Sequence, residues 1–158
     1  MNAGEVYTLF IIFIFIFMIP SVNYFAVLVA AVSAIVLGFL WYGPLFGKPW
    51  MKLMGFTKES LEKSKKAGMT KTYVLMVLTT LVTAYVLSHV ISFATAFMQT
   101  SGISAGLSAG FWMWLGFTVP ILMDAQMWEG KPWKLFWINA SYRLVSLSLM
   151  GAILAGWM

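Results

Sequence analysis

Residues 41–52 of this 158-residue chain read WYGPLFGKPWMK. A long apolar run precedes them and ends at Trp41 and Tyr42, and lysines begin downstream of them. Tryptophan and tyrosine gather where a membrane meets water, and glycine and proline break helices. We therefore interpret this stretch as the place where a membrane-spanning helix leaves the lipid.

The composition of the whole chain indicates an integral membrane protein. Hydrophobic residues make up 61% of the sequence and charged residues 9%, and the mean hydropathy is +0.89. Soluble domains carry about 25% charged residues, so a chain with so little charge belongs in lipid. The chain is also too short for two sizeable domains.

The net charge of +5 lies in a single segment. Residues 43–72 hold seven lysines and two glutamates, and the rest of the chain is balanced. Because lysine-rich loops stay in the cytoplasm, we expect the basic loop, residues 43–71, to be cytoplasmic. Its lysines can also attract anionic lipids. The charge thus indicates topology and a lipid bilayer as partner, and we expect no nucleic-acid partner.

Four apolar segments are long enough to cross a bilayer, which takes about 20 helical residues. They cover residues 24–42, about 71–96, 104–128 and 135–157. The predicted fold class is all-α: a polytopic membrane helix bundle with four core helices, formed by residues 24–158. The turn at residues 129–134 should then be cytoplasmic, and the uncharged link at 98–104 and the carboxy terminus outside. A bacterial inner membrane or an equivalent membrane is the expected location.

A shorter apolar segment, residues 6–19, precedes the four spans. As a helix it would cover about 21 Å, less than the hydrocarbon thickness of about 30 Å. A cleaved signal peptide is the alternative, but no lysine or arginine precedes the segment, and signal peptides normally start with basic residues. We expect residues 1–23 to form a separate amino-terminal helix that spans the membrane or lies at its surface.

Small residues recur at every fourth position in all four spans. In lipid, where no hydrophobic drive joins helices, such residues let backbones approach closely. The stripes are Ala26, Ala30, Ala34 and Gly38; Thr80, Ala84, Ser88 and Ser92; Gly102, Gly106 and Gly110; and Ser148, Ala152 and Gly156. We expect the four helices to pack through these faces.

The tetrapeptide GKPW occurs twice, at residues 47–50 and 130–133, each time at the predicted cytoplasmic end of a span. One interpretation is a duplicated helical hairpin, with two halves related by an axis along the membrane normal. The alternative is that two cytoplasmic exits independently use glycine and proline to stop a helix and tryptophan and lysine to anchor it.

Three stretches resemble a known family. They are WYGPLFGKPWMKLMGFTKE at residues 41–59, the glycine-rich third span, and EGKPWKLFWIN at residues 129–139, followed by LMGAIL at 149–154. The sequence is similar here to the small membrane proteins catalogued as domain of unknown function 1761, over roughly residue 23 to the end. The resemblance implies a four-span core and no known chemistry, and the first two dozen residues depart from the family's usual start.

Polar and ionisable residues inside spans mark candidate sites. Arg143 is the strongest, since it lies about 13 Å beyond Lys134 along a helix. Asn139 shares its face, and Tyr142 precedes it directly. Asp124, near the end of the third span, could pair with Arg143 and clasp the last two spans together. A substrate or ion site, or simple snorkelling of Arg143 to the surface, are the alternatives.

Two further positions are secondary candidates. His89 is expected to be a hydrogen-bonded packing residue in the second span, with a proton relay as the alternative. Pro120 interrupts the third span and frees a carbonyl near Gly116, which predicts a kink or a hinge there.

The sequence leaves three classes of function open. With no cysteine and one histidine, we expect no metal site and no cofactor, and no catalytic residues are assigned. We favour a non-enzymatic packing or assembly protein, which could form a homo-oligomer through its glycine faces. A small transporter or channel with a cytoplasm-facing polar pocket at Asn139, Arg143 and Asp124 is the first alternative. A lipophile-binding protein or membrane enzyme is the second. A cavity at Arg143, rather than a dry ion pair, would favour transport.

Overall fold

The computed structural model describes residues 4, 7, 22–57, 59–60, 62 and 68–157. Within this part the chain is helical and contains no strand. Its helices are α2 (Tyr24–Leu40), α3 (Gly47–Leu53), α5 (Thr70–Met98), α6 (Gly102–Met113), α7 (Val119–Met127) and α8 (Trp133–Gly156), with π-helical turns η1 (Trp41–Leu45) and η2 (Trp114–Thr118). Of the expected amino-terminal helix at residues 6–19, only residue 7 belongs to the described part, and the rest lies outside it.

Four of these helical segments are long and apolar enough to cross a membrane: Tyr24–Leu45, Thr70–Met98, Gly102–Met127 and Trp133–Gly156. They match the four predicted spans, with ends that differ by a few residues. Each is at least as long as the 20 or so residues that a bilayer requires. The all-α, four-span fold class is therefore confirmed.

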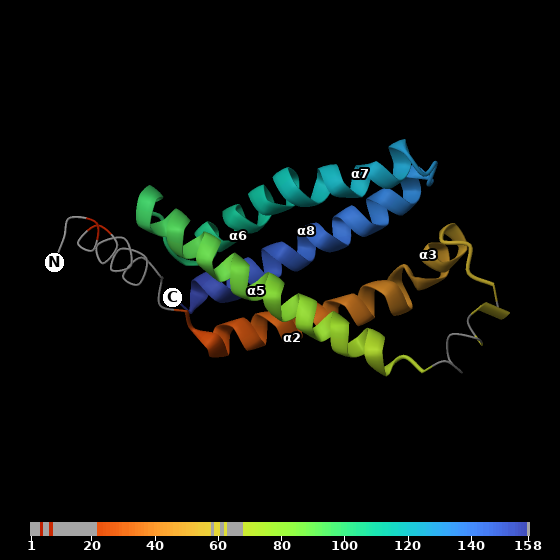
Figure 1. The fold of residues 1–158 in the computed structure, drawn as a ribbon, viewed down its shortest axis with the longest axis horizontal. Helices are drawn as coiled ribbons and strands as arrows, with labels where there is room; N and C mark the ends of the chain where they lie inside the picture. Colours follow the sequence, from red (N-terminus) through yellow and green to blue (C-terminus); the bar gives the residue numbers. More distant parts are fainter. Residues whose placement is uncertain are drawn as a thin grey trace.

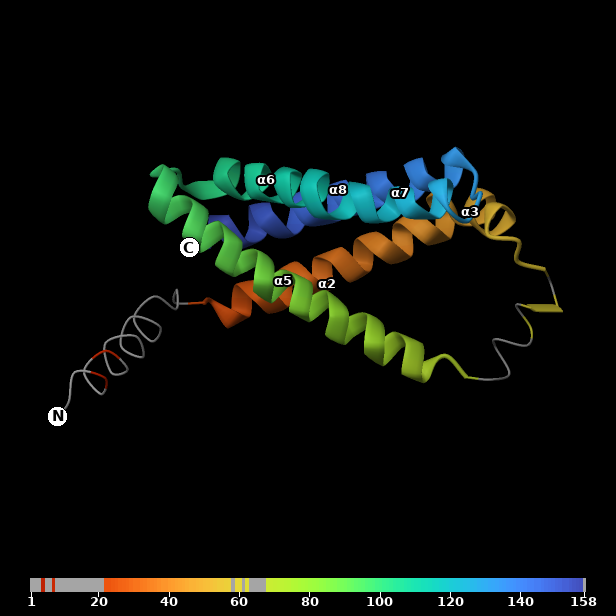
Figure 2. The ribbon, with the colours of Figure 1, turned by 45° about the horizontal axis from the view of Figure 1, so that its top comes forward.

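The spans run alternately up and down. In Figure 1, α6 and α7 lie along α8, and α5 crosses α8 and α2 obliquely. Figure 2 gives the same arrangement from another side, with α3 and the turn between α7 and α8 at one end of the bundle. The two GKPW segments therefore lie at the same end, as the topology prediction requires. We call it the α3 end.

The opposite end joins the two termini of the bundle. Asn23 caps α2 by accepting the Ala26 N–H at 3.1 Å, and its amide Nδ2 donates to the Trp157 carbonyl at 3.3 Å. The Phe25 and Trp157 rings stack with centroids 5.5 Å apart. The start of the first span is thereby fastened to the end of the fourth.

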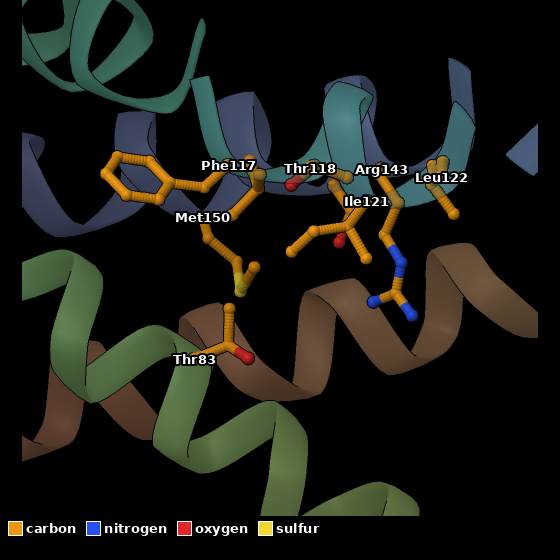
Figure 3. A pocket seen from close by; sticks show the side chains of 9 residues that line it. Thr83, Phe117, Thr118, Ile121, Leu122, Arg143 and Met150 are labelled. Atoms are coloured by element: carbon orange, nitrogen blue, oxygen red, sulfur yellow. The ribbon is translucent and has the colours of Figure 1, made fainter. Parts of the chain in front are cut away.

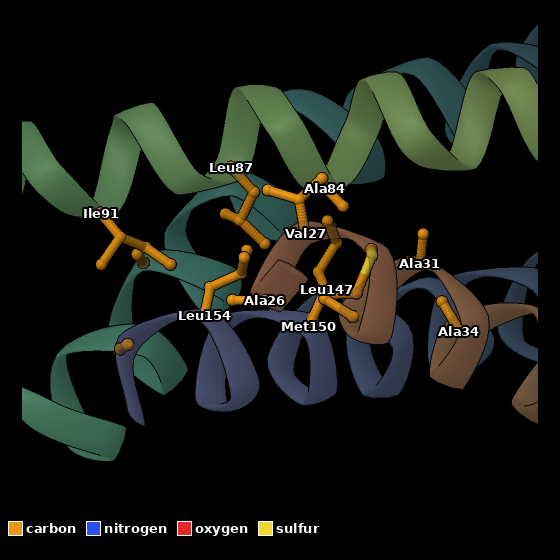
Figure 4. Close-up of a cluster of buried hydrophobic side chains, with 13 residues drawn as sticks. Ala26, Val27, Ala31, Ala34, Ala84, Leu87, Ile91, Leu147, Met150 and Leu154 are labelled. Atoms are coloured by element: carbon orange, nitrogen blue, oxygen red, sulfur yellow. The ribbon is translucent and has the colours of Figure 1, made fainter. Parts of the chain in front are cut away.

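The buried face of α2 is built mainly from alanines, and most of its large side chains face outward. On α2 the buried residues are Ala26, Val27, Ala30, Ala31 and Ala34, whereas Phe25, Leu28, Val32, Val36 and Phe39 are at least half exposed. Figure 4 shows the alanines of α2 and Leu87 of α5 meeting Met150 and Leu154 of α8. This inversion suits a lipid surrounding, in which close backbone approach stabilises the bundle.

The closest approach joins α6 to α8. A Cβ atom added to Gly106 would collide with the backbone carbonyl of Gly151, and one on Gly110 would come within 2.7 Å of the Leu147 carbonyl oxygen. The predicted glycine face of the third span is thus correct at Gly106 and Gly110. The predicted stripe of the fourth span is only partly correct: Ser148 meets Gly110 through its Cα atom, but Gly106 is approached by Gly151 and Ala155 rather than by Ala152 and Gly156.

The helix break expected at Gly43 and Pro44 is displaced. The first span continues through both residues as the π-helical turn η1 and stops only at Phe46, where φ is −120° and ψ is 8°. Such turns are rare and occur mostly as single π-bulges inside α-helices, and this one accommodates Pro44, which has no N–H to donate. The third span contains a second π-helical turn, η2, and both turns begin with the triplet Trp-x-Gly.

Candidate functional site

Arg143 lies near the middle of α8, and its side chain is exposed rather than packed. The guanidinium carbon stands 5.5 Å from the centroid of the Tyr142 ring, within the range of a cation–π contact. The same side chain lines two cavities of the bundle. A charge at this depth is costly in lipid, so it requires a partner or water.

The larger cavity, which we call the tyrosine cavity, lies between α2, α3, α5 and α8 and has a volume of about 420 Å³. Its polar lining is Tyr42, Trp50, Thr79, Thr80, Tyr142 and Arg143, and its other lining residues are Ile35, Gly38, Phe39, Met69 and Met76. A few polar groups in a mainly apolar hollow of this size are typical of small-molecule sites.

Two long-range hydrogen bonds hold the wall of the tyrosine cavity in place. The Tyr42 hydroxyl donates to Asn139 Oδ1 at 3.0 Å, and the Trp41 indole N–H donates to the Ile138 carbonyl at 3.1 Å. Both donors belong to η1 and both acceptors to α8, 97 residues away. Because η1 widens the helix, two consecutive aromatic side chains can both reach α8.

Aromatic rings complete this wall. Tyr42 makes edge-to-face contacts with Trp50 and Tyr142, with centroids 5.3 and 5.0 Å apart. The Tyr142 hydroxyl donates to the Ala34 carbonyl at 3.4 Å and lies 2.9 Å from a Cβ added to Gly38. A glycine at position 38 therefore leaves the room that Tyr142 occupies.

The second cavity, of about 270 Å³, is lined by residues of α5, η2, α7 and α8. Figure 3 shows Arg143 and Leu122 toward one end of this cavity and Thr83 and Met150 toward the other. Phe117 and Ile121, which also line it, are 63% and 69% exposed. This cavity opens toward the lipid-facing side of the bundle, and we call it the lateral cavity.

Comparison with protein families gives one match. The family described as protein of unknown function DUF1761 matches residues 25–155. The chain belongs to this family. The resemblance seen in the sequence is thereby confirmed. Neither a curated protein nor a solved structure matches the chain, so the family supplies no chemistry for the site.

The ion pair between Asp124 and Arg143, which the sequence suggested as a link between the last two spans of this DUF1761 member, is not formed. In the described part of the chain no carboxylate oxygen lies within 4.0 Å of the Arg143 guanidinium. Asp124 is exposed near the end of α7 and lines neither the tyrosine cavity nor the lateral cavity. Of the predicted site residues, Arg143 and Tyr142 line the tyrosine cavity, Asn139 borders it only through its bond to Tyr42, and Asp124 lies apart.

The secondary candidates lie away from Arg143. His89 Nδ1 is 3.0 Å from the Tyr85 carbonyl one turn earlier, and the two rings meet edge to face at 4.5 Å. His89 is not among the residues that line the two cavities. Gly116 lies inside η2, and Pro120 is at the beginning of α7, so the helix departs from α geometry where the kink was expected. Whether this point acts as a hinge stays a prediction.

Several lining residues were not identified from the sequence as parts of a site. Tyr42 and Trp50 were interpreted as anchors at the membrane surface, and Thr79 was not singled out at all. Tyr42 is instead half-buried and bonded to α8. A signal was present, since polar side chains recur at Thr79, Thr80 and Thr83 on the same span as Ala84. Among the described residues, no group of three histidine, cysteine or acidic side chains could hold a metal ion.

Proposed function

We propose that this protein is a small membrane transporter that binds an organic anion at Arg143. One observation carries the proposal: the Arg143 guanidinium lies on two cavities at once and has no carboxylate partner among the described residues. A cation inside a membrane span that lacks a counter-charge is stabilised by an anionic ligand. When the tyrosine cavity is filled with water, it gives such a ligand a route to Arg143.

The positions of the cavities along the bundle support movement of a ligand across the membrane rather than its retention at one site. The tyrosine cavity is lined by Met69 and by α5 from Met76 to Thr80, and the lateral cavity continues at Thr83. A third cavity, of about 390 Å³, is lined by α5 from Val90 to Met98 and by α6. Leu87, 2% exposed, lies between the second and third cavities along α5. In the proposed mechanism, Leu87 closes the path in this state and Arg143 holds the ligand on the α3 side.

The lysine-rich segment gives this path a direction. We place the α3 end in the cytoplasm, because the basic segment begins there with Lys48 and Lys52 and the turn 129–134 lies at the same end. The tyrosine cavity would then open to the cytoplasm. The link between α5 and α6 and the carboxy terminus would lie outside.

The other two classes of function have less support. The glycine faces that suggested a homo-oligomer are occupied within the protomer, where Gly106 and Gly110 contact α8. An enzyme would need a general acid or base beside the bound ligand, and His89 is not at either cavity of Arg143.

Binding of small anions to the detergent-solubilised full chain tests the proposal. We expect 4-methylpentanoate or pentane-1-sulfonate to raise the melting temperature of the wild type and not that of Arg143→Gln. Asp124→Asn is the matched control, since it removes a charge that lines neither of these cavities, and it should respond like the wild type. The anion that binds should then cross proteoliposomes only with Arg143 present. Equal responses of the wild type and Arg143→Gln to both anions would overturn the proposal.

A further inference from the structure

The hydrogen-bonding groups of the tyrosine cavity restrict which anion it accepts. Besides Arg143, its polar lining consists of four hydroxyl groups, on Tyr42, Tyr142, Thr79 and Thr80, and the indole of Trp50. Each hydroxyl carries one proton to donate and can still accept through its oxygen. The direction of each existing bond therefore decides what the cavity offers to a ligand.

Both threonine hydroxyls donate their proton to the backbone of α5. Thr80 Oγ1 donates to the Met76 carbonyl at 2.7 Å, and Thr79 Oγ1 donates to the Leu75 carbonyl at 2.9 Å, with Met76 as a second acceptor at 3.1 Å. In a transmembrane helix this back-bonding satisfies the hydroxyl proton without water. What these two residues present to the cavity is an acceptor oxygen.

Both tyrosine hydroxyls also donate their proton to an acceptor within the protein. Tyr42 donates to Asn139 Oδ1 at 3.0 Å, and Tyr142 donates to the Ala34 carbonyl at 3.4 Å. In the lateral cavity Thr83 repeats the pattern, since its Oγ1 donates to the Thr79 carbonyl at 2.9 Å. All five hydroxyl groups around Arg143 thus donate their proton within the protein and present only an acceptor oxygen to a ligand.

Two side chains of the tyrosine cavity can donate to a ligand, Arg143 and Trp50. Arg143 has five N–H groups, and within the described part of the chain none of them bonds to a carboxylate. The Trp50 indole N–H also has no acceptor among the described residues. An anion bound to Arg143 alone would leave the hydroxyl oxygens facing it, and two acceptors repel each other.

We infer that the ligand of this site carries a hydrogen-bond donor beside its anionic group: a small, partly apolar amino acid or hydroxy acid. Its anionic group would bind Arg143, its donor would face the oxygens of Thr79 and Thr80, and its apolar part would lie against Ile35, Phe39 and Met76. This inference rests on the proposed function, and it adds a requirement that a simple anion-binding site does not have.

Three matched probes test the donor requirement: leucine, 2-hydroxy-4-methylpentanoate and 4-methylpentanoate. They share one carbon skeleton and one carboxylate and differ only in an ammonium, a hydroxyl or no donor. Binding is measured by calorimetry on the solubilised full chain at pH 7.5. We expect leucine, the hydroxy acid or both to bind about three- to tenfold more tightly than 4-methylpentanoate, the gain typical of one added hydrogen bond.

A second set of variants assigns the effect to the threonines. Thr80→Val and Thr79→Val keep the side-chain shape and remove the acceptor oxygen, so each should lower the affinity of the donor-bearing probe and leave that of 4-methylpentanoate unchanged. Thr95→Val, on α5 away from Arg143, is the matched control.

The possible outcomes separate the two proposals. If all three probes bind equally, in a way that requires Arg143, the donor requirement is wrong and the anion-binding function stands. If 4-methylpentanoate binds more tightly than both other probes, the inference is likewise overturned. If no probe binds and pentane-1-sulfonate does not bind either, both proposals fail.

Discussion

The Tyr42 hydroxyl donates a 3.0 Å hydrogen bond to the side-chain oxygen of Asn139, and so joins the end of the first span to the fourth. The bond places a residue from the most distinctive stretch of the sequence directly beside the strongest candidate site. Tyr42 contacts the Tyr142 ring on the same side, and Arg143 stands over that ring. The end of the first span, at Tyr42, therefore forms part of the candidate binding site around Arg143.

Tyr42→Phe should destabilise the protein by about 0.5–1.5 kcal/mol, the usual net contribution of one hydrogen bond. The ring and its contacts with Trp50 remain, so the loss reports on the bond to Asn139. Unfolding of the solubilised protein by sodium dodecyl sulfate measures the change. Tyr24→Phe is the matched control, because Tyr24 is 72% exposed on the outside of α2. Equal stability of the two variants would show that the Tyr42 bond contributes nothing.

Gly106→Ala should be far more damaging than an alanine at another glycine of the same span. Its new Cβ would meet the Gly151 carbonyl and Ala155 Cβ, so α6 and α8 would have to separate. Overpacking of this kind typically costs about 1–3 kcal/mol, and backbone atoms on the far side cannot rotate away. The same unfolding measurement applies.

Gly116→Ala is the control for this change. No described atom lies within 4 Å of a Cβ at Gly116, and alanine is the better helix former by about 1 kcal/mol. We expect Gly116→Ala to be neutral or slightly stabilising. If Gly106→Ala proved equally harmless, the close α6–α8 contact would be wrong.

The fold was largely predictable because lipid imposes simple rules on a sequence. Apolar length indicated the four spans, and small residues indicated the packed faces of α2 and of α6 at Gly106 and Gly110. The face of α8 was assigned one residue out of register, because Ser148, Ala152 and Gly156 form as regular a stripe as Leu147, Gly151 and Ala155. Only the contact with Gly106 distinguishes Gly151 from its neighbours.

The candidate site was only partly predictable. Polar residues are unusual inside an apolar span, and for this reason the sequence alone singled out Arg143, Asn139 and Tyr142. The direction of Tyr42 could not be inferred, since the π-helical turn η1 contains an extra residue and rotates the side chains beyond it relative to a regular helix. The missing Asp124–Arg143 pair has a similar cause: depth in the membrane can be estimated from sequence, but the direction of a side chain around its helix cannot be.

Double substitution tests the absence of this pair. If Asp124 and Arg143 formed a buried ion pair, removing either partner would cost about 3–5 kcal/mol, and the two losses would not add. Because the structure keeps the two side chains apart, we expect Asp124→Asn and Arg143→Gln to be additive within about 0.5 kcal/mol. The measurement is a double-mutant cycle on unfolding. A coupling energy above about 1 kcal/mol would show that Asp124 and Arg143 form an ion pair. Arg143 would then already have a counter-charge, and the argument for an anion site would fail.

The orientation of the bundle can be tested with single cysteines, because the natural chain contains none. Lys52 lies at the α3 end, Ser101 lies in the link between α5 and α6, and both are exposed. With the basic loop held in the cytoplasm, a membrane-impermeant maleimide should label Ser101→Cys in intact cells and Lys52→Cys only after lysis. Val32→Cys, on the outside of α2, is the control for a position in lipid and should stay unlabelled both before and after lysis. The opposite pattern would invert the bundle, and the tyrosine cavity would then receive its ligand from outside the cell.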